Sequence, residues 1–174
     1  MPSLLLVVTV ALMLLIWFHP STGDFSEDNP FWNGLETFTT KFDVHPLDSM
    51  DELPPNPSGT ALIVIPYKPF VGKDLEDLRN YVSKGGTLII LDDYAYGNQI
   101  LGHLGLDLRF TGKPLLDPLF NYRNEWLPRI TTFSDFAQGK GLNSIVLNHG
   151  STLNNTSQIT VLAWSSRFSY LDFN

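Results

Sequence analysis

The feature that most constrains the fold is a short apolar segment, Thr87–Leu91, which follows an amphipathic helical pattern and a double glycine. It reads TLIIL, so neither face of the predicted strand is strongly polar. A strand that is apolar on both faces is typical of a parallel sheet covered by helices on both sides. Thr60–Ile65, which reads TALIVI and stops at Pro66, predicts a second strand of the same kind.

The segment between these strands predicts a helix over Val71–Lys84. Gly85 follows it and can take the left-handed conformation that ends a helix. A strand, a helix and a strand in this order favour a right-handed crossover between parallel strands. The expected fold class is therefore α/β, a mostly parallel sheet flanked by helices in the manner of flavodoxin. The apolar stripe of the helix consists of Val71, Leu75, Leu78 and Val82.

The remaining elements are predicted to be shorter. One helix opens at Asn33 or Gly34, and another is capped by Asn98 and ends at Gly105. Thr111–Pro128 contains several prolines and glycines and is expected to be a long irregular excursion. The other strand candidates are Phe42–His45, Leu106–Phe110, Ser144–Leu147 and Ile159–Trp164.

Composition excludes several classes of function. The net charge is −7, and an acidic surface repels phosphate, so nucleic acid is not an expected partner. The chain has no cysteine, which rules out disulfides, thiolate metal ligands and cysteine nucleophiles. There is no P-loop, and the histidines lack metal-ligand spacing, so neither a metal nor a cofactor is expected. The histidines are His19, His45, His103 and His149.

The amino-terminal segment, residues 1–20, is separate in character from residues 21–174, which are expected to form a single domain. Leu4–Phe18 is apolar apart from Thr9. It fits an uncleaved single-pass membrane anchor, a cleaved signal peptide or a buried core helix. Acidic residues follow it and the first cation is Lys41, which favours a domain outside the cytoplasm. Phe31 and Trp32 are expected to pack under the sheet, with contact to a bilayer surface as the alternative.

Polar residues follow the predicted strands at the edge where parallel sheets bind ligands. The ligand-binding candidates there are Tyr67, Asp92, Asp93 and Asn98. Asp92 and Asp93 can serve as a general base or bind a hard cation. The alternative is structural: one carboxylate accepts backbone N–H groups of the turn that follows. Adjacent residues of a strand point to opposite sides, so only one of the two is expected to face this edge.

A hydrolytic triad is the catalytic alternative. Ser165 would be the nucleophile, His149 the base and Asp92 the group that orients the histidine. Ser165 lacks the glycine-flanked elbow that exposes a nucleophilic serine in related hydrolases. Asn148–Ser151 also has the composition of an ordinary turn.

Three segments resemble a single family: the opening STGDFSEDNPFWNG, the centre SKGGTLIILDDYAYGNQILGHLGL and the ending AWSSRFSYLDFN. They are similar to the family called domain of unknown function 4350, over nearly all of the chain from Ser21. The resemblance implies a membrane-associated domain similar in fold to class I glutamine amidotransferase-like domains. It also implies a final strand and a second transmembrane segment that this chain lacks, so a truncated form is expected. Amidotransferase chemistry is not implied, because the required cysteine is absent.

Two classes of function follow. The first is a membrane-anchored, non-catalytic module that binds a protein partner, expected to be membrane-associated, or a small ligand at the strand ends. The second is a serine-type or carboxylate-dependent hydrolase that uses the residues named above. A cavity with a Ser–His hydrogen bond would favour the hydrolase.

Overall fold

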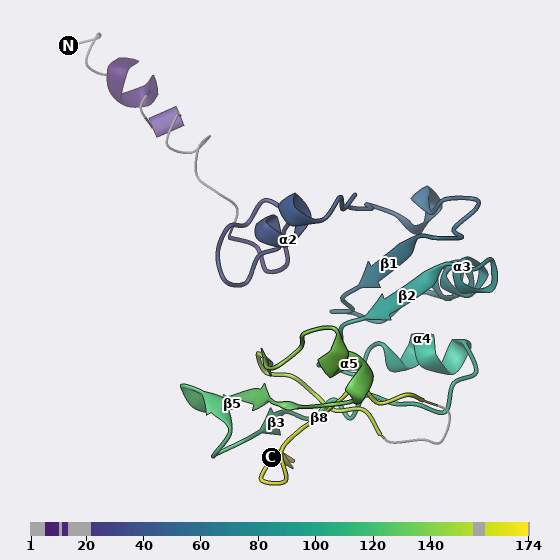
Figure 1. Ribbon diagram of the computed structural model, residues 1–174. Coiled ribbons are helices and arrows are strands. Elements are labelled where there is room, and N and C mark those ends of the chain that lie inside the picture. The colour runs from purple at the N-terminus through teal and green to yellow at the C-terminus, as the bar shows by residue number, and fades with distance from the viewer. Residues whose placement is uncertain (1–5, 11, 14–21, 155–158, 174) are drawn as a thin grey trace. The chain divides into compact units, whose positions relative to one another are not determined.

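The computed structural model describes residues 6–10, 12–13, 22–154 and 159–173, and it divides into two compact units, 1–49 and 50–174. The apolar segment Leu4–Phe18 lies partly outside the described residues, and its described residues, 6–10 and 12–13, are helical and exposed. Among the residues that are described, no helix combines the length and the apolar character needed to cross a membrane. Figure 1 labels the elements along the chain.

The first unit contains one short helix, α2 (Glu36–Lys41), preceded by a folded loop. The helix starts later than predicted, because Leu35 occupies the N-cap position and no side chain caps it. The strand predicted at Phe42–His45 is wrong, since residues 42–45 are turn or irregular.

The second unit contains the predicted parallel pair. Strand β1 (Ala61–Val64) pairs in parallel with β2 (Thr87–Ile90), with Val64 opposite Ile90. Helix α3 (Gly72–Ser83) connects them and lies beside β2 in Figure 1. Gly85 has a φ of 92°, the left-handed conformation predicted for the end of this helix. The parallel strand–helix–strand arrangement inferred from the sequence is therefore confirmed.

One face of the pair forms a hydrophobic core with α3 and α4 (Asn98–His103). Val64, Leu78 and Ile100 are its buried centre, and Leu78 is completely inaccessible. The partly buried residues around this centre are Met50, Leu62, Phe70, Leu75, Leu88, Ile90 and Leu104.

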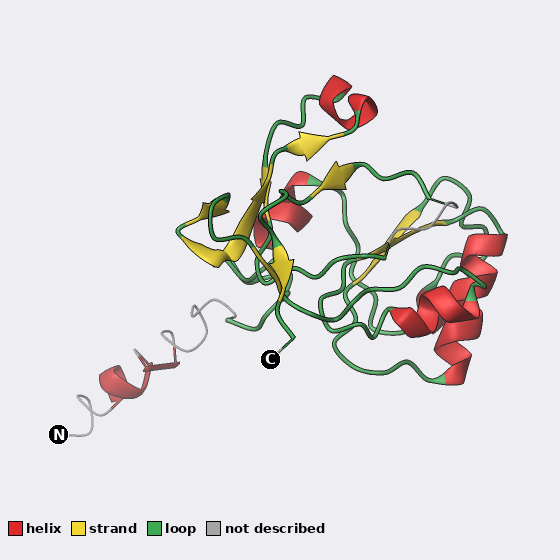
Figure 2. Cartoon of the chain, turned by 90° about the horizontal axis from the view of Figure 1, so that it is seen from below, coloured by secondary structure: helices red, strands yellow, loops and turns green. Residues whose placement is uncertain are grey.

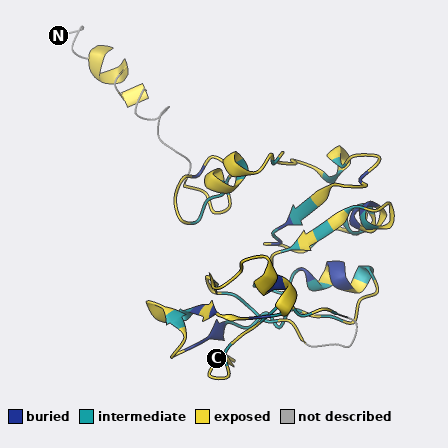
Figure 3. Cartoon of the chain, in the orientation of Figure 1, coloured by how far each residue is buried: buried dark blue, intermediate teal, exposed yellow. Residues whose placement is uncertain are grey.

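The predicted α/β fold, flavodoxin-like or glutamine amidotransferase-like, is wrong. The parallel sheet has only two strands, and no large parallel sheet flanked by helices is present in the described chain. The second face is not covered as predicted: residues along β2 alternate between exposed and half-buried, and Ile89 is 39% exposed (Figure 3). An apolar strand therefore does not by itself require two covered faces. In the part of the chain that the structure describes, helices pack on one face only.

The rest of the second unit consists of short antiparallel strands joined by long loops, as Figure 2 shows. A second core is formed here by Ile130, Phe133 and Ala137. Sheet β4–β5–β7 has three strands, while β3 pairs with β9 and β6 with β8. The elements are β3 (Leu115–Leu116), β4 (Asn121–Tyr122), β5 (Asn124–Ile130), β6 (Thr132–Phe133), α5 (Asp135–Gly139), β7 (Ile145–Val146), β8 (Ala163–Trp164) and β9 (Tyr170–Leu171).

Several sequence predictions fail in this region. Thr111–Pro128 is not irregular throughout, because it includes β3, β4 and most of β5. Pro128 is accommodated in β5 because its carbonyl, which proline retains, accepts the N–H of Leu147. The predicted strand Leu106–Phe110 is reduced to a single bridge between Phe110 and Leu153. The strands predicted at residues 144–147 and 159–164 shrink to β7 and β8.

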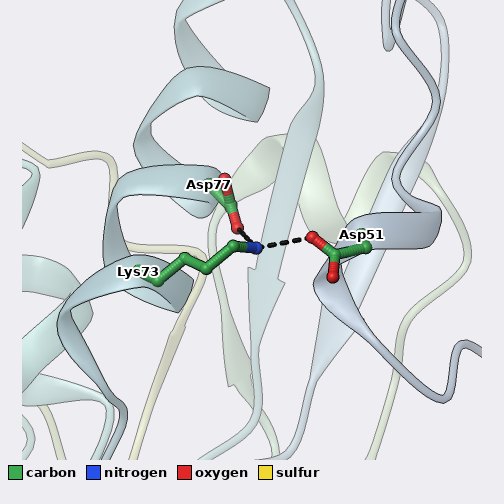
Figure 4. Close-up of polar contacts among 3 residues, drawn as sticks. All are labelled: Asp51, Lys73 and Asp77. Atoms are coloured by element: carbon green, nitrogen blue, oxygen red, sulfur yellow. Dashed lines mark hydrogen bonds and ion pairs between the residues drawn. The ribbon is translucent and has the colours of Figure 1, made fainter.

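A lysine ties the short helix η1 (Met50–Glu52) to α3 (Figure 4). The Nζ of Lys73 lies 2.5 Å from an Asp51 oxygen and 2.9 Å from an Asp77 oxygen. Hydrogen bonds to Asp51 and then Asp77 raise the pKa of Lys73 above its ordinary value. Solvent-accessible ion pairs contribute little to stability, so this contact chiefly fixes the position of η1.

Candidate functional site

The candidate site is the edge at which β1 and β2 end. The N–H of Leu91 donates to the carbonyl of Val64 at 3.0 Å and extends the parallel pairing by one step. The N–H of Phe70, in the loop after β1, donates to the Gln99 side chain at 2.8 Å. The loop after β1 is thereby held against the start of α4. We call this edge, residues 65–71 and 91–97, the strand-end rim.

Asp92 has a structural role at the strand-end rim. Its Oδ1 accepts the N–H of Tyr94 at 2.9 Å and its Oδ2 accepts the N–H of Gly97 at 2.6 Å. A Cβ on Gly97 would lie 2.8 Å from Asp92 Oδ2, so glycine permits this close contact. Asp92 thus organises the turn, which is the structural alternative that the sequence offered.

Asp93 is half-buried, and its electrostatic environment is different. Burial raises its pKa above the ordinary value, a backbone hydrogen bond lowers it, the charge of Asp92 raises it, and His149 lowers it. His149 therefore lies within electrostatic range of Asp93, although the two residues are far apart in the sequence.

His149 is held by Trp126. The two rings stack with centroids 5.1 Å apart, and the backbone N–H of His149 donates to the backbone carbonyl of Trp126 at 3.2 Å. His149 itself has a φ of 52°, an unusual value for a residue with a side chain. Ser165 follows β8 and is exposed. It makes no hydrogen bond to His149 or Asp92 in the described chain, so the three triad candidates do not form a connected set there.

The two other ligand-binding candidates have different surroundings. Asn98 exchanges two hydrogen bonds with the backbone of Phe110, at 2.8 and 3.0 Å. It is the first residue of α4 rather than its cap, because Gly97 occupies the N-cap position. Tyr67 is 70% exposed, with Lys68 Nζ 5.5 Å from the centre of its ring.

Two side chains at the strand-end rim were missed in the sequence. Tyr94 is 66% exposed and Leu91 is 52% exposed, and both follow β2. Together with Tyr67 and Val71, which is 63% exposed, they give the strand-end rim four large, exposed, mostly apolar side chains. The only sequence indication was the YAY segment after the aspartates. The sequence pattern does not distinguish residues that other elements bury from residues that stay exposed to solvent.

The sequence also gave little indication of Asp117, which is 1% exposed. Its Oδ2 accepts the hydroxyls of Ser166 and Ser169 at 2.5 and 3.0 Å, and its Oδ1 accepts the N–H groups of Leu119 and Phe120 at 2.9 and 2.7 Å. Burial raises the pKa of Asp117, but these hydrogen bonds outweigh it and hold the pKa below the ordinary value. The carboxylate therefore fastens the carboxyl-terminal segment to the turn after β3. The Asp-Pro pair, typical of turns, was the available signal.

An apolar hollow of about 570 Å³ lies elsewhere in the second unit. It contains no titratable side chain and none of the residues of the strand-end rim. Its walls are Leu108, Leu153, Ile159, Thr160, Val161, Leu162 and Trp164. Among the described residues, no group of three or more histidine, aspartate or glutamate side chains is placed to hold a metal ion.

These features define a small protein of mixed α and β structure, with a one-sided parallel pair that presents exposed aromatic residues at its strand ends. The chain belongs to the family described as Domain of unknown function (DUF4350), which it matches over residues 32–172. The family resemblance seen in the sequence is thus confirmed, whereas likeness to the glutamine amidotransferase fold is not. Comparison with curated proteins and with solved structures gave no match.

Proposed function

We propose that this protein is a non-catalytic binding module that docks a partner protein on the strand-end rim. The observation that carries the proposal is the exposure of Tyr67, Leu91 and Tyr94 at one edge of the parallel pair. Tyrosine is enriched where proteins bind one another, because its ring is large, rigid and polar at one end. A rim of this kind offers anchors for a partner.

The scale of the interaction supports a protein partner. Burying these three side chains removes about 300 Å² of apolar surface from water, a gross gain of about 7 kcal/mol. The entropy lost on association consumes much of this gain, so the partner must also contact surface around the rim. The two aspartates and the net charge of −7 favour a partner with a positively charged surface.

Internal hydrogen bonding supports a scaffolding role for two polar candidates. Asp92 accepts two backbone N–H groups, and the amide of Asn98 is engaged with the Phe110 backbone. Both side chains hold the loops in place. The strand-end rim is therefore a preorganised surface, which lowers the entropic cost of docking.

We further propose that Leu4–Phe18 tethers the module to a membrane as a single pass, with residues 21–174 outside the cytoplasm. The apolar length of the segment and the acidic residues after it support this topology. A tether of this kind would place the partner at the same membrane. Flotation of the full-length chain with lipid vesicles tests the tether independently of the partner.

Site-directed photocrosslinking tests the docking proposal. A photoreactive residue replaces Tyr67 or Tyr94 in the full-length protein in its native membranes, and Tyr122, 44% exposed but outside the rim, is the matched control. We expect the same adduct from positions 67 and 94 and none from 122. The double variant Y67A/Y94A should lose co-purification of that partner. Equal crosslinking from position 122 would refute docking at the rim.

A carboxylate-dependent hydrolase is the second candidate, favoured by one observation. Burial raises the pKa of Asp93, the charge of His149 acts on it in the opposite direction, and carboxylates with perturbed pKa values cluster at catalytic sites. The test is hydrolysis of a panel of ester, amide and phosphoester substrates by the wild type, D93N and H149A. Activity that both substitutions abolish would replace the binding proposal, whereas equal background rates would remove the candidate.

A further inference from the structure

The loop before α2 exposes aromatic side chains that no described residue of its own unit covers. Trp32 is 84% exposed, Phe25 54% and Phe31 50%. The sheets all belong to the second unit, so the packing of Phe31 and Trp32 under the sheet stays a prediction. Figure 3 shows the loop mainly in the colour of exposed residues. Large aromatic residues held in water are costly, so this loop has the character of a contact surface.

A buried asparagine gives the loop a defined shape. Asn29 is completely inaccessible, and its amide donates to the Gly23 carbonyl at 2.8 Å and to Asn33 Oδ1 at 3.1 Å. Its Oδ1 accepts the N–H of Phe31 at 2.9 Å. A Cβ on Gly34 would lie 2.0 Å from the Asn29 carbonyl, so this close turn needs glycine. The aromatic residues thus lie on a loop whose conformation is fixed by hydrogen bonds.

The hydrogen bonds also keep the loop close to the apolar segment Leu4–Phe18. The Phe25 N–H donates to the Asn33 carbonyl at 2.8 Å, and the Asn33 amide reaches the Thr22 carbonyl at 3.5 Å. Trp32 is the neighbour of Asn33. The step from Phe18 to Thr22 spans at most about 14 Å, whatever its conformation. Trp32 therefore stays within about 28 Å of the end of the apolar segment. The loop can thus reach the polar layer of a bilayer, which is about 5–8 Å thick on each side.

Charge selects the kind of lipid surface. Residues 22–49 carry six carboxylates and one lysine. This balance opposes contact with anionic headgroups, which attract basic segments instead. Tryptophan has an amphipathic ring that favours the membrane–water boundary without needing charge. The carboxylates are Asp24, Glu27, Asp28, Glu36, Asp43 and Asp48.

We infer that Phe25, Phe31 and Trp32 form an aromatic foot that rests in the headgroup region of a neutral phospholipid bilayer. The inference depends on the proposed membrane tether and adds a second contact with the same membrane. Its consequence is orientational, because a foot beside the tether limits how the first unit tilts on the bilayer.

The absence of cysteine allows a clean test with single labels. An environment-sensitive fluorophore is attached to P30C, next to the foot, in the full-length chain in phosphatidylcholine vesicles. The matched control is T40C, an exposed position in α2. Quenching by aqueous iodide and by spin-labelled lipid is measured for both, and P30C is repeated with F31A/W32A.

We expect P30C to be shielded from iodide several-fold more than T40C and to be quenched by shallow lipid spin labels. The F31A/W32A variant should lose this shielding, and vesicles rich in phosphatidylglycerol should weaken it. If iodide quenches the label equally at both positions while the protein stays bound to the vesicles, the inferred contact of the aromatic foot with the bilayer is wrong and the membrane tether still holds. Failure of the chain to float with vesicles would instead reject the tether. Shielding that persists without lipid would assign the surface to a protein contact and also overturn the inference.

Discussion

The buried carboxylate of Asp117 gives the sharpest test of the packing in the second unit. The substitution D117N preserves shape, and its oxygen can still accept the N–H groups of Leu119 and Phe120. It removes the charge and replaces the oxygen that accepts the hydroxyls of Ser166 and Ser169 by an NH₂ group. A hydrogen bond to a charged acceptor stabilises the fold by about 1 kcal/mol more than a hydrogen bond to a neutral acceptor. D117N also removes the cost of burying a charge, which offsets part of the lost stability. We expect a net destabilisation of about 2 kcal/mol.

Urea unfolding of the full-length protein, followed by tryptophan fluorescence, measures this loss. With a slope of about 2 kcal/mol/M, the midpoint of D117N should fall by about 1 M. S169A removes one hydroxyl donor and should cost about 1 kcal/mol. D107N, at an exposed position, is the control and should stay within about 0.5 kcal/mol of the wild type. An unchanged midpoint for D117N would refute the assigned role of the carboxylate.

The dependence on pH follows from the lowered pKa of Asp117. A depressed folded-state pKa means that the stabilisation is complete above the unfolded-state value of 3.8 and is lost as the pH falls through the folded-state pKa. The difference in free energy of unfolding between the wild type and D117N should therefore be constant from neutral pH down to about pH 5. It should disappear in stronger acid. A gap that widened in acid would contradict the linkage.

Three further predictions concern the parallel pair and its surroundings. G86A places a Cβ 2.3 Å from the Tyr81 ring, so we expect a loss of about 1–3 kcal/mol in urea unfolding. D92A leaves the N–H of the buried Gly97 without its acceptor and should lower the free energy of unfolding by about 1–2 kcal/mol. Hydrogen exchange of the amides in the turn should become faster, and unchanged exchange would contradict the role assigned to Asp92. K73M should lower the thermal midpoint slightly at low ionic strength, and the difference should vanish at high ionic strength because salt screens exposed pairs.

The sequence predicted the candidate site unevenly. The strand ends located Asp92 and Tyr67, and the backbone confirms that β1 and β2 end at the same edge. The structural alternative for Asp92 followed from its position before a turn, since a short acidic side chain bonds nearby N–H groups. The Asp-Pro pair marked a turn at Asp117, but the role of the carboxylate could not be inferred, because its partners Ser166 and Ser169 are far away in the chain. The role of Tyr94 and Leu91 depends on whether other elements bury them, and this is a property of the whole fold.

Local chemistry in the chain determined the crossover: the stripe of α3, the left-handed Gly85 and two short apolar strands specify a parallel pair without help from distant residues. Only the tertiary structure decided how many strands join that pair and whether its second face is covered. An apolar side chain in the sequence indicates that its burial is favourable, but it does not indicate which element packs against it. The two-stranded sheet, the exposed Ile89 and the buried Asp117 all depend on contacts between segments far apart in the chain, which no local pattern encodes.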